Sequence, residues 1–150
     1  MRMSSKRKAL TAAAVDHPLA SATQIPLKRL QQETFLMREQ GSGTRMAMER
    51  FFSEKAIALK TGSEMSTNEA IKQAVQADMG LGILSLHTVA LELETKRLVV
   101  LDVQSFPIMR DWYVVHRKGK RLTATAQMFK EFLLNEGAKI AEEKGFSLAF

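Results

Sequence analysis

Short apolar runs and amphipathic stretches alternate along the chain from residue 34 onward. Runs that predict strands occupy residues 34–37, 57–60, 83–86, 98–103 and 108–116. Helical periodicity, with apolar residues three and four positions apart, is found at residues 44–55, between residues 66 and 80, at 88–94 and from 123 onward. Strands that alternate with helices in this way predict βαβ units, and therefore an α/β fold with a mostly parallel sheet and flanking helices.

The ends of two helices carry signals of their own. Ser66 and Glu69 have the S-x-x-E spacing of a capping box, which predicts that Ser66 caps the helix that follows. Gly80 and Gly82 are expected to end that helix. The last helix is expected to begin near Thr123. Its apolar side is formed by Ala126, Phe129, Phe132 and Leu133.

Charge is concentrated at the N-terminus. The chain has 22 basic and 16 acidic residues, and four of the basic ones, Arg2, Lys6, Arg7 and Lys8, precede residue 10. The rest of the chain is nearly neutral, so we expect residues 1–15 to form a disordered basic tail. Phosphate binding by this tail is an alternative. A secretion signal is another, although its apolar region, Ala9–Val15, is short.

The first candidate site is the turn Gly41-Ser42-Gly43-Thr44-Arg45. Glycines let the backbone approach a ligand closely, and the free N–H groups of the following helix favour an anion. Ser42 and Thr44 would add donors, and Arg45 a charged fork. The alternative is structural, with Ser42 capping the helix and Arg45 pairing with Glu49. The spacing does not match a phosphate-binding P-loop.

The second candidate turn contains Ser66, Thr67 and Asn68. The capping box explains Ser66 without a ligand, whereas Asn68 is less well explained by capping. Ser85 ends the third predicted strand and would reach the same edge of a parallel sheet. The expected ligand-binding set is Gly41, Ser42, Gly43, Thr44, Arg45, Ser66, Thr67, Asn68 and Ser85.

Enzyme chemistry finds little support among the residues. The three histidines, His17, His87 and His116, have no metal-ligand spacing, and no G-x-S-x-G elbow is present. The absence of cysteine excludes disulfides and a thiol nucleophile. No apolar run approaches the eighteen or so residues of a membrane span. We therefore expect no catalysis, no metal, no cofactor and no membrane insertion.

A series of segments in order resembles the effector-binding domain of LysR-type transcriptional regulators. The shared segments are residues 17–20, 25–30, 35–39, 41–45, 68–75 and 80–83. Residues 84–88, 97–103 and 106–117 are most similar to the branch that controls RuBisCO and Calvin-cycle operons. The resemblance covers about residues 16–135.

The resemblance implies a periplasmic-binding-protein-like (type II) fold of two α/β subdomains that hold a small effector between them. Residues 16–104 would form the second subdomain, and residues 105–145 would return to the first, which is incomplete here. Ser42–Arg45 would lie on the ligand-facing turn and Ser66–Asn68 on its neighbour. A glycine is usual in the family where this chain has Asp78-Met79, so we expect that helix to end differently.

The expected function is that of a cytoplasmic ligand-sensing domain of a regulator of carbon-fixation genes, shortened at its N-terminus. Its effector would be a small anionic metabolite, and its partners another copy or a full-length regulator. No recognition helix is seen, so we expect no specific DNA binding by this chain alone. The alternatives are a stand-alone small-anion-binding protein of the same fold, which could pair with full-length regulators, and an exported solute-binding protein.

Overall fold

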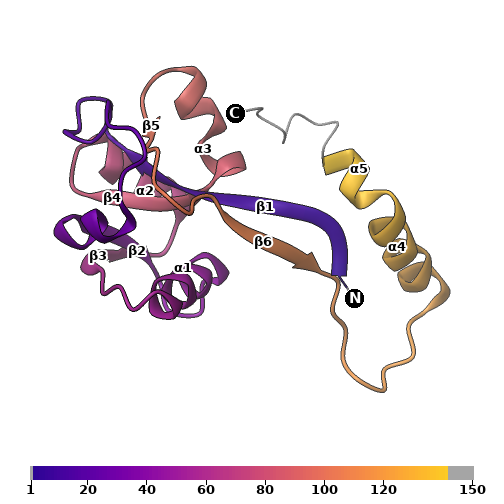
Figure 1. The fold of residues 1–150 in the computed structure, drawn as a ribbon. Coiled ribbons are helices and arrows are strands. Elements are labelled where there is room, and N and C mark those ends of the chain that lie inside the picture. The colour runs from indigo at the N-terminus through magenta and orange to yellow at the C-terminus, as the bar shows by residue number, and fades with distance from the viewer. Residues whose placement is uncertain (1, 142–150) are drawn as a thin grey trace. The chain divides into compact units, whose positions relative to one another are not determined.

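A computed structural model describes residues 2–141, which form a six-stranded sheet with flanking helices (Figure 1). The strands are β1 (Arg2–Ala13), β2 (Thr34–Arg38), β3 (Lys60–Met65), β4 (Leu81–Ser85), β5 (Val99–Val100) and β6 (Ile108–Tyr113). The helices are η1 (Leu27–Gln32), α1 (Gly43–Glu54), α2 (Asn68–Gln76), α3 (Leu86–Glu94), α4 (Ala124–Asn135) and α5 (Gly137–Ala141). None of these helices is long and apolar enough to cross a bilayer.

The chain divides into two compact units. The larger is Lys8–Ile108, and the smaller combines Met1–Arg7 with Met109–Phe150. The boundary expected from the sequence, near residue 104, falls a few residues before this division. The last residues of the expected 16–145 domain lie outside the described part of the chain.

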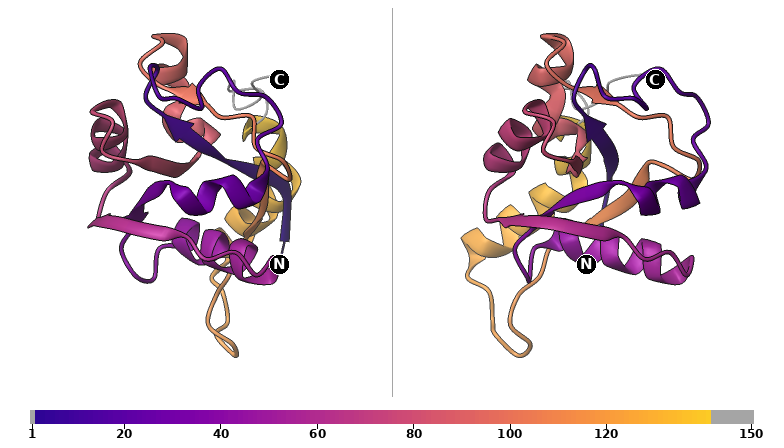
Figure 2. Two further views of the ribbon diagram at one scale, coloured as in Figure 1. Left: turned by 60° about the vertical axis from the view of Figure 1, so that its left-hand side comes forward. Right: turned by 90° about the vertical axis from the view of Figure 1, so that its left-hand side faces the viewer.

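The sheet of the larger unit has the order β3-β2-β4-β1-β5 (Figure 2). β2 runs parallel to β3 and to β4, with Leu36 opposite Gly82 in the second pairing. β1 runs antiparallel to both β4 and β5. The α/β fold class is confirmed, and the parallel arrangement applies to β3, β2 and β4. The sheet as a whole is mixed because of β1.

The N-terminal segment is the main correction to the sequence-based expectation. Residues 1–15 were expected to be disordered, but Arg2–Ala13 form β1. Ala12 pairs with Gly82 on one side and with Val100 on the other, so this strand lies inside the sheet. Its second half consists of small or apolar residues that are buried from Ala9 to Ala14. A strand covered on both faces has no polar alternation, and the expectation of a tail missed it for that reason.

The core of the larger unit lies around an aromatic group on β2, α1 and the loop before β6. Phe35 is fully buried, and its ring centroid is 6.3 Å from that of Phe52. Phe51 packs edge-to-face against Phe52 and Phe106, at 5.2 and 5.4 Å. The apolar face predicted for residues 44–55 therefore fixes α1 against β2 and positions the turn between them.

Three helices end in the same hydrogen-bonded motif. Ala56, Asp78 and Lys96 follow the C-caps of α1, α2 and α3 and have left-handed backbone, with φ of 53°, 54° and 55°. In each case the next N–H reaches back to a carbonyl five residues earlier, as in a Schellman motif. These bonds join Ile57 to Phe52 (3.0 Å), Met79 to Ala74 (3.0 Å) and Arg97 to Glu92 (2.8 Å). None of the three positions has the glycine that this conformation favours.

The end of α2 differs from the expectation that Gly80 and Gly82 close it. The helix ends at Gln76, and Asp78 takes the left-handed position. Gly80 serves a different purpose: a Cβ there would lie 2.7 Å from the carbonyl oxygen of Thr34. The glycine thus lets the chain pass close to β2 before β4 begins.

Several predicted strands are displaced or shorter in the structure. Of residues 57–60, only Lys60 belongs to β3, and the apolar signal there comes from Ile57, which is buried beside the end of α1. Residues 98–103 contribute only the two-residue β5, although Leu98, Leu101 and Val103 are buried. β6 stops at Tyr113, and the turn of helix η1 was not predicted.

The smaller unit contains most of β6, α4 and α5, and β6 pairs with β1. The helix α4 begins beside Thr123, as the sequence predicts, and the Thr123 hydroxyl caps it by accepting from the N–H of Ala126 at 3.3 Å. None of the described side chains of α4 is buried. Met128, Phe129 and Phe132 are 70%, 60% and 47% exposed. The apolar side of this helix is therefore uncovered in the isolated chain.

Candidate functional site

Three helix N-termini meet one edge of the sheet. α1, α2 and α3 directly follow β2, β3 and β4, and these three strands are parallel neighbours. Their carboxyl ends, and the first turns of the helices, therefore lie at the same edge. Free backbone N–H groups and the positive ends of the helix dipoles make such an edge favourable for an anion. All nine candidate residues lie on these three strand-to-helix connections or in the first turn of α1.

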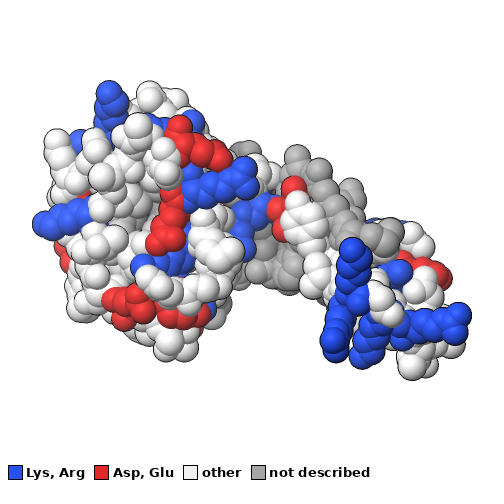
Figure 3. Space-filling view, turned by 90° about the horizontal axis from the view of Figure 1, so that it is seen from below, with Lys and Arg blue, Asp and Glu red and all other residues white. Residues whose placement is uncertain are grey.

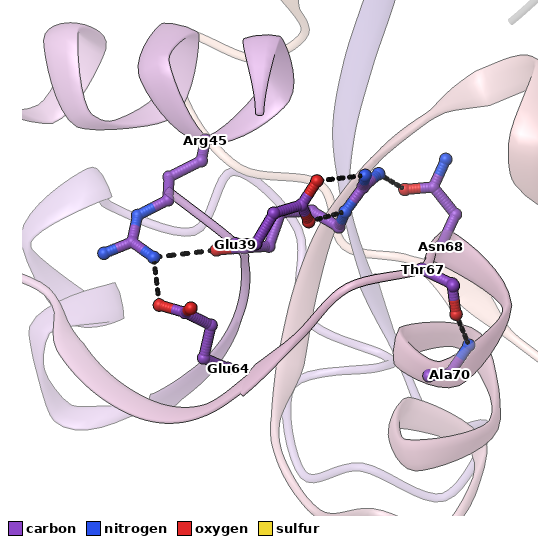
Figure 4. Close-up of polar contacts among 7 residues, drawn as sticks. Glu39, Arg45, Glu64, Thr67, Asn68 and Ala70 are labelled. Atoms are coloured by element: carbon purple, nitrogen blue, oxygen red, sulfur yellow. Dashed lines mark hydrogen bonds and ion pairs between the residues drawn. The ribbon is translucent and has the colours of Figure 1, made fainter. Parts of the chain in front are cut away.

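Arg45 joins the first two connections. On the first turn of α1, its Nη1 donates to Glu64 Oε2 at 2.5 Å and to the carbonyl of Arg38 at 2.8 Å (Figure 4). Its Nε donates to Glu49 at 2.7 Å, the pairing that the structural alternative predicted. The hydrogen bonds that Arg45 donates to Glu49 and Glu64 raise its pKa. The guanidinium is fixed in place, and both of its bound carboxylates are on the surface.

Arg38 makes the second link, and sequence reasoning missed it. At the end of β2, its guanidinium holds Glu39 through two hydrogen bonds, of 2.7 and 2.9 Å. It also donates to the Oδ1 atom of Asn68 at the start of α2 (Figure 4). The bond from Arg38 lowers the pKa of Glu39. The sequence signal that could have revealed this role is the position of Arg38, a cation at the end of a buried strand shortly before the glycine turn.

The caps of α1 and α2 differ from the predicted ones. Thr67, rather than Ser66, caps α2, and its Oγ1 accepts from the N–H of Ala70 at 3.1 Å (Figure 4). Glu69 does not close a capping box, since its carboxylate accepts from Gln73 at 3.0 Å. The prediction was wrong by one residue because it relied on the spacing of Ser66 and Glu69, whereas Thr67 is the residue that directly precedes the helix.

The residues of the first turn are arranged around α1. Gly41 has a φ of 87°, and a Cβ there would meet nothing within 4 Å. Ser42 is the N-cap residue and is buried, but its side chain makes no capping bond. Gly43 begins the helix and Thr44 is half-buried on its first turn. The hydroxyl of Ser42 is thus not committed to capping.

Ser85 lies at the third connection, as the N-cap residue of α3. Ser85 is 6% exposed, and its Oγ atom has no hydrogen-bond partner in the described structure. Ala9 of β1 is its partner in the sheet register, and the fully buried Thr11 on the same strand also has an unpaired hydroxyl. Buried hydroxyls without a partner are uncommon in folded proteins. Ser85 is thus a free polar group at the helix terminus.

The chemistry of this edge suits an oxyanion better than a metal. Its donors are two guanidinium groups, hydroxyls and backbone N–H groups, which bind carboxylate or phosphate. Among the described residues, no group of three His, Cys, Asp or Glu side chains could hold a metal ion. An anion that bound Arg38 or Arg45 would take the place of Glu39 or Glu64, because these carboxylates already occupy the guanidiniums.

Comparison with known proteins identifies the family. The sequence model of the LysR substrate binding domain matches residues 6–138. The chain belongs to this family of LysR substrate-binding domains. This LysR domain is 58% identical over 125 residues to the RuBisCO operon transcriptional regulator of Allochromatium vinosum, and 47% identical over 128 residues to the transcriptional activator CmpR of Synechocystis. Those matches cover 83% and 84% of the chain, but only 41% and 42% of the relatives.

Solved structures agree with this assignment. The regulatory domain of Synechocystis CcmR, in complex with 2-PG, matches at a TM-score of 0.78 and 40% identity. The match covers 87% of the present LysR domain and 62% of the CcmR chain. The effector-binding domain of QuiR, in complex with shikimate, matches at a TM-score of 0.80 and 24% identity, which supports the fold. The resemblance noted in the sequence is thus confirmed, as is the type II periplasmic-binding-protein-like fold.

Proposed function

We propose that this LysR domain is the effector-sensing part of a cytoplasmic transcriptional regulator of carbon-fixation genes. The observation that carries the proposal is the 58% identity with a RuBisCO operon regulator over most of the chain. The chain spans about two fifths of that relative's length, so regulation of transcription is an activity of the larger assembly to which the domain would contribute. The two relatives compared above are regulators of transcription, in keeping with a binding function.

The proposed effector is a small anion that binds at the carboxyl edge of β2, β3 and β4. The helix termini supply N–H donors, Ser42 and Ser85 supply hydroxyls, and Arg45 supplies the charge. Glu64 is bound to Arg45, but the side chain of Glu64 is 54% exposed. A ligand oxygen could therefore replace its carboxylate without leaving Arg45 unpaired. The ligand of CcmR, 2-PG, is a suitable first probe.

Calorimetric titration of 2-PG into the 150-residue chain tests this site. Loss of a charge-assisted hydrogen bond costs about 1.5–3 kcal/mol, so Arg45→Ala should weaken binding by at least about tenfold. Arg50→Ala is the matched control, since Arg50 lies on the same helix and forms the same kind of i,i+4 pair, with Glu54 at 2.7 Å. Arg50→Ala should leave the affinity unchanged.

Equal affinities for the Arg45→Ala and Arg50→Ala variants would show that Arg45 is structural, as its bonds to Glu49 and Glu64 alone would suggest. If the unaltered chain binds none of 2-PG, sulfate and a sugar phosphate, the small-anion proposal itself is wrong.

We also propose that the domain associates with a second copy or with a full-length regulator. The uncovered apolar side of α4 supports this, because an exposed surface with Met128, Phe129 and Phe132 favours burial against another chain. The CcmR regulatory domain extends beyond the matched region, since the match covers 62% of that chain.

A further inference from the structure

The loop between β6 and α4 carries a cluster of unpaired cations. Arg117, Lys118, Lys120 and Arg121 are all exposed, and they occupy four of five consecutive positions. Figure 2 shows this segment as a long excursion of the chain between the strand and the helix. Figure 3 shows Lys and Arg side chains gathered over it. We name these four residues the basic loop.

The basic loop differs from the other arginine and lysine positions described above. Arg38, Arg45, Arg50 and Lys72 are each bound to a carboxylate. Within the described part of the chain, the four cations of the basic loop form no ion pair. From Trp112 to Lys130 the sequence has no Asp or Glu, so no carboxylate close in sequence neutralises the loop. Its charge is therefore available to an external partner.

The backbone of the loop presents these side chains outward. Lys120 donates its N–H to the carbonyl of Arg117 at 3.2 Å, which closes a tight turn. Gly119 within it has a φ of 77°, and a Cβ there would meet nothing within 4 Å. The turn stands in open space, and its cations lie on a convex tip rather than in a pocket. A convex tip suits an extended partner better than an enclosed small ligand.

We propose that the basic loop contacts the phosphate backbone of double-stranded nucleic acid without reading its sequence. The turn brings the Cα atoms of Arg117 and Lys120 within about 7 Å of each other, a length over which DNA presents roughly four negative charges. Arginine and lysine are the side chains that contact phosphates, and such contacts release condensed counterions. The exposed apolar side chains near the loop, Tyr113 and Val115, precede it and none lies among its cations, so an anionic membrane fits the loop less well.

The contact is separate from the effector site and does not depend on it. It is also consistent with the expectation that this chain alone reads no specific sequence, because phosphate contacts carry no sequence information.

Fluorescence anisotropy with a labelled duplex of arbitrary sequence tests the proposal, with salt varied between about 50 and 200 mM. The loop variant is Lys118→Gln/Lys120→Gln in the 150-residue chain. The control is Lys28→Gln/Lys60→Gln, which removes the same two charges from exposed positions in the larger unit. Each phosphate contact adds about 0.9 to the slope of log affinity against log salt. The loop variant should lose up to about 1.8 of that slope, and the control should keep the slope of the unaltered chain.

Equal losses in the two variants would overturn the proposal, because they would reflect net charge alone. Absence of binding by the unaltered chain would overturn it too. Vesicles containing anionic lipid form a second arm: if the chain binds the vesicles in a loop-dependent manner but does not bind the duplex, the partner is a membrane and the proposal is wrong.

Discussion

Replacing Ala56 by glycine should stabilise the domain through the backbone conformation of this residue, without adding a contact. Ala56 is exposed and has a φ of 53°, at the end of α1. An L-residue in this left-handed conformation costs roughly 1–2 kcal/mol, which glycine avoids. Glycine costs about 0.5–1 kcal/mol in additional chain entropy. The difference predicts a gain of about 0.5–1 kcal/mol in the free energy of unfolding.

The assay is urea unfolding followed by circular dichroism. With a slope of about 2 kcal/mol per molar urea, the midpoint should rise by about 0.3–0.5 M while the slope stays constant. Ala47→Gly is the matched control, since it makes the same change inside α1. In a helix interior glycine costs about 1 kcal/mol, so that midpoint should fall by about 0.5 M.

The two substitutions should therefore have opposite signs, although they lie nine residues apart. A midpoint that falls in both variants would refute the reasoning, because it would mean that α1 does not end in the left-handed motif in solution. The same logic extends to Asp78, which has the same left-handed backbone at the end of α2.

Two further predictions concern acid and assembly. The pKa of Glu39 is lowered by Arg38, so its contribution to stability is present at neutral pH and is lost as the pH falls below the ordinary glutamate value near 4.5. Glu39→Gln should thus lower the unfolding midpoint at pH 7, and its difference from the unaltered chain should disappear near pH 3, as urea melts at both pH values would show. Light scattering during size-exclusion chromatography should reveal species larger than 16.8 kDa that dissociate in the Phe129→Ser/Phe132→Ser variant. A monomer at every concentration would contradict this.

The sequence predicted the part of the fold that depends on local periodicity. The helices α1, α2 and α4 follow from their apolar spacing, and α4 begins beside Thr123 as expected. It also predicted that the turns at Ser42 and Asn68 share one edge of the sheet, because both follow parallel strands. These features depend on neighbours within one or two helical turns.

What the sequence could not predict depends on contacts between distant residues. The bond between Arg38 and Asn68 requires β2 and β3 to pair with Arg38 opposite Met65, after a register shift between Phe35 and Met37. A strand of alanines near a basic terminus has no local signal, so β1 could be found only from its partners.

The central position of β1 constrains how the domain folds. Ala9 pairs with Ser85, and Ala13 pairs with Val99, so β1 has partners more than seventy residues later in the chain. Until β4 and β5 have emerged from the ribosome, β1 has neither of these two pairing partners. The parallel strands β2 and β3 then have no antiparallel strand beside their part of the sheet. Contacts of such long sequence separation slow folding and leave strand edges open in the meantime. A nascent chain of this domain should therefore depend on chaperones more than its size suggests, and a rearranged chain in which β1 follows β5 should fold faster.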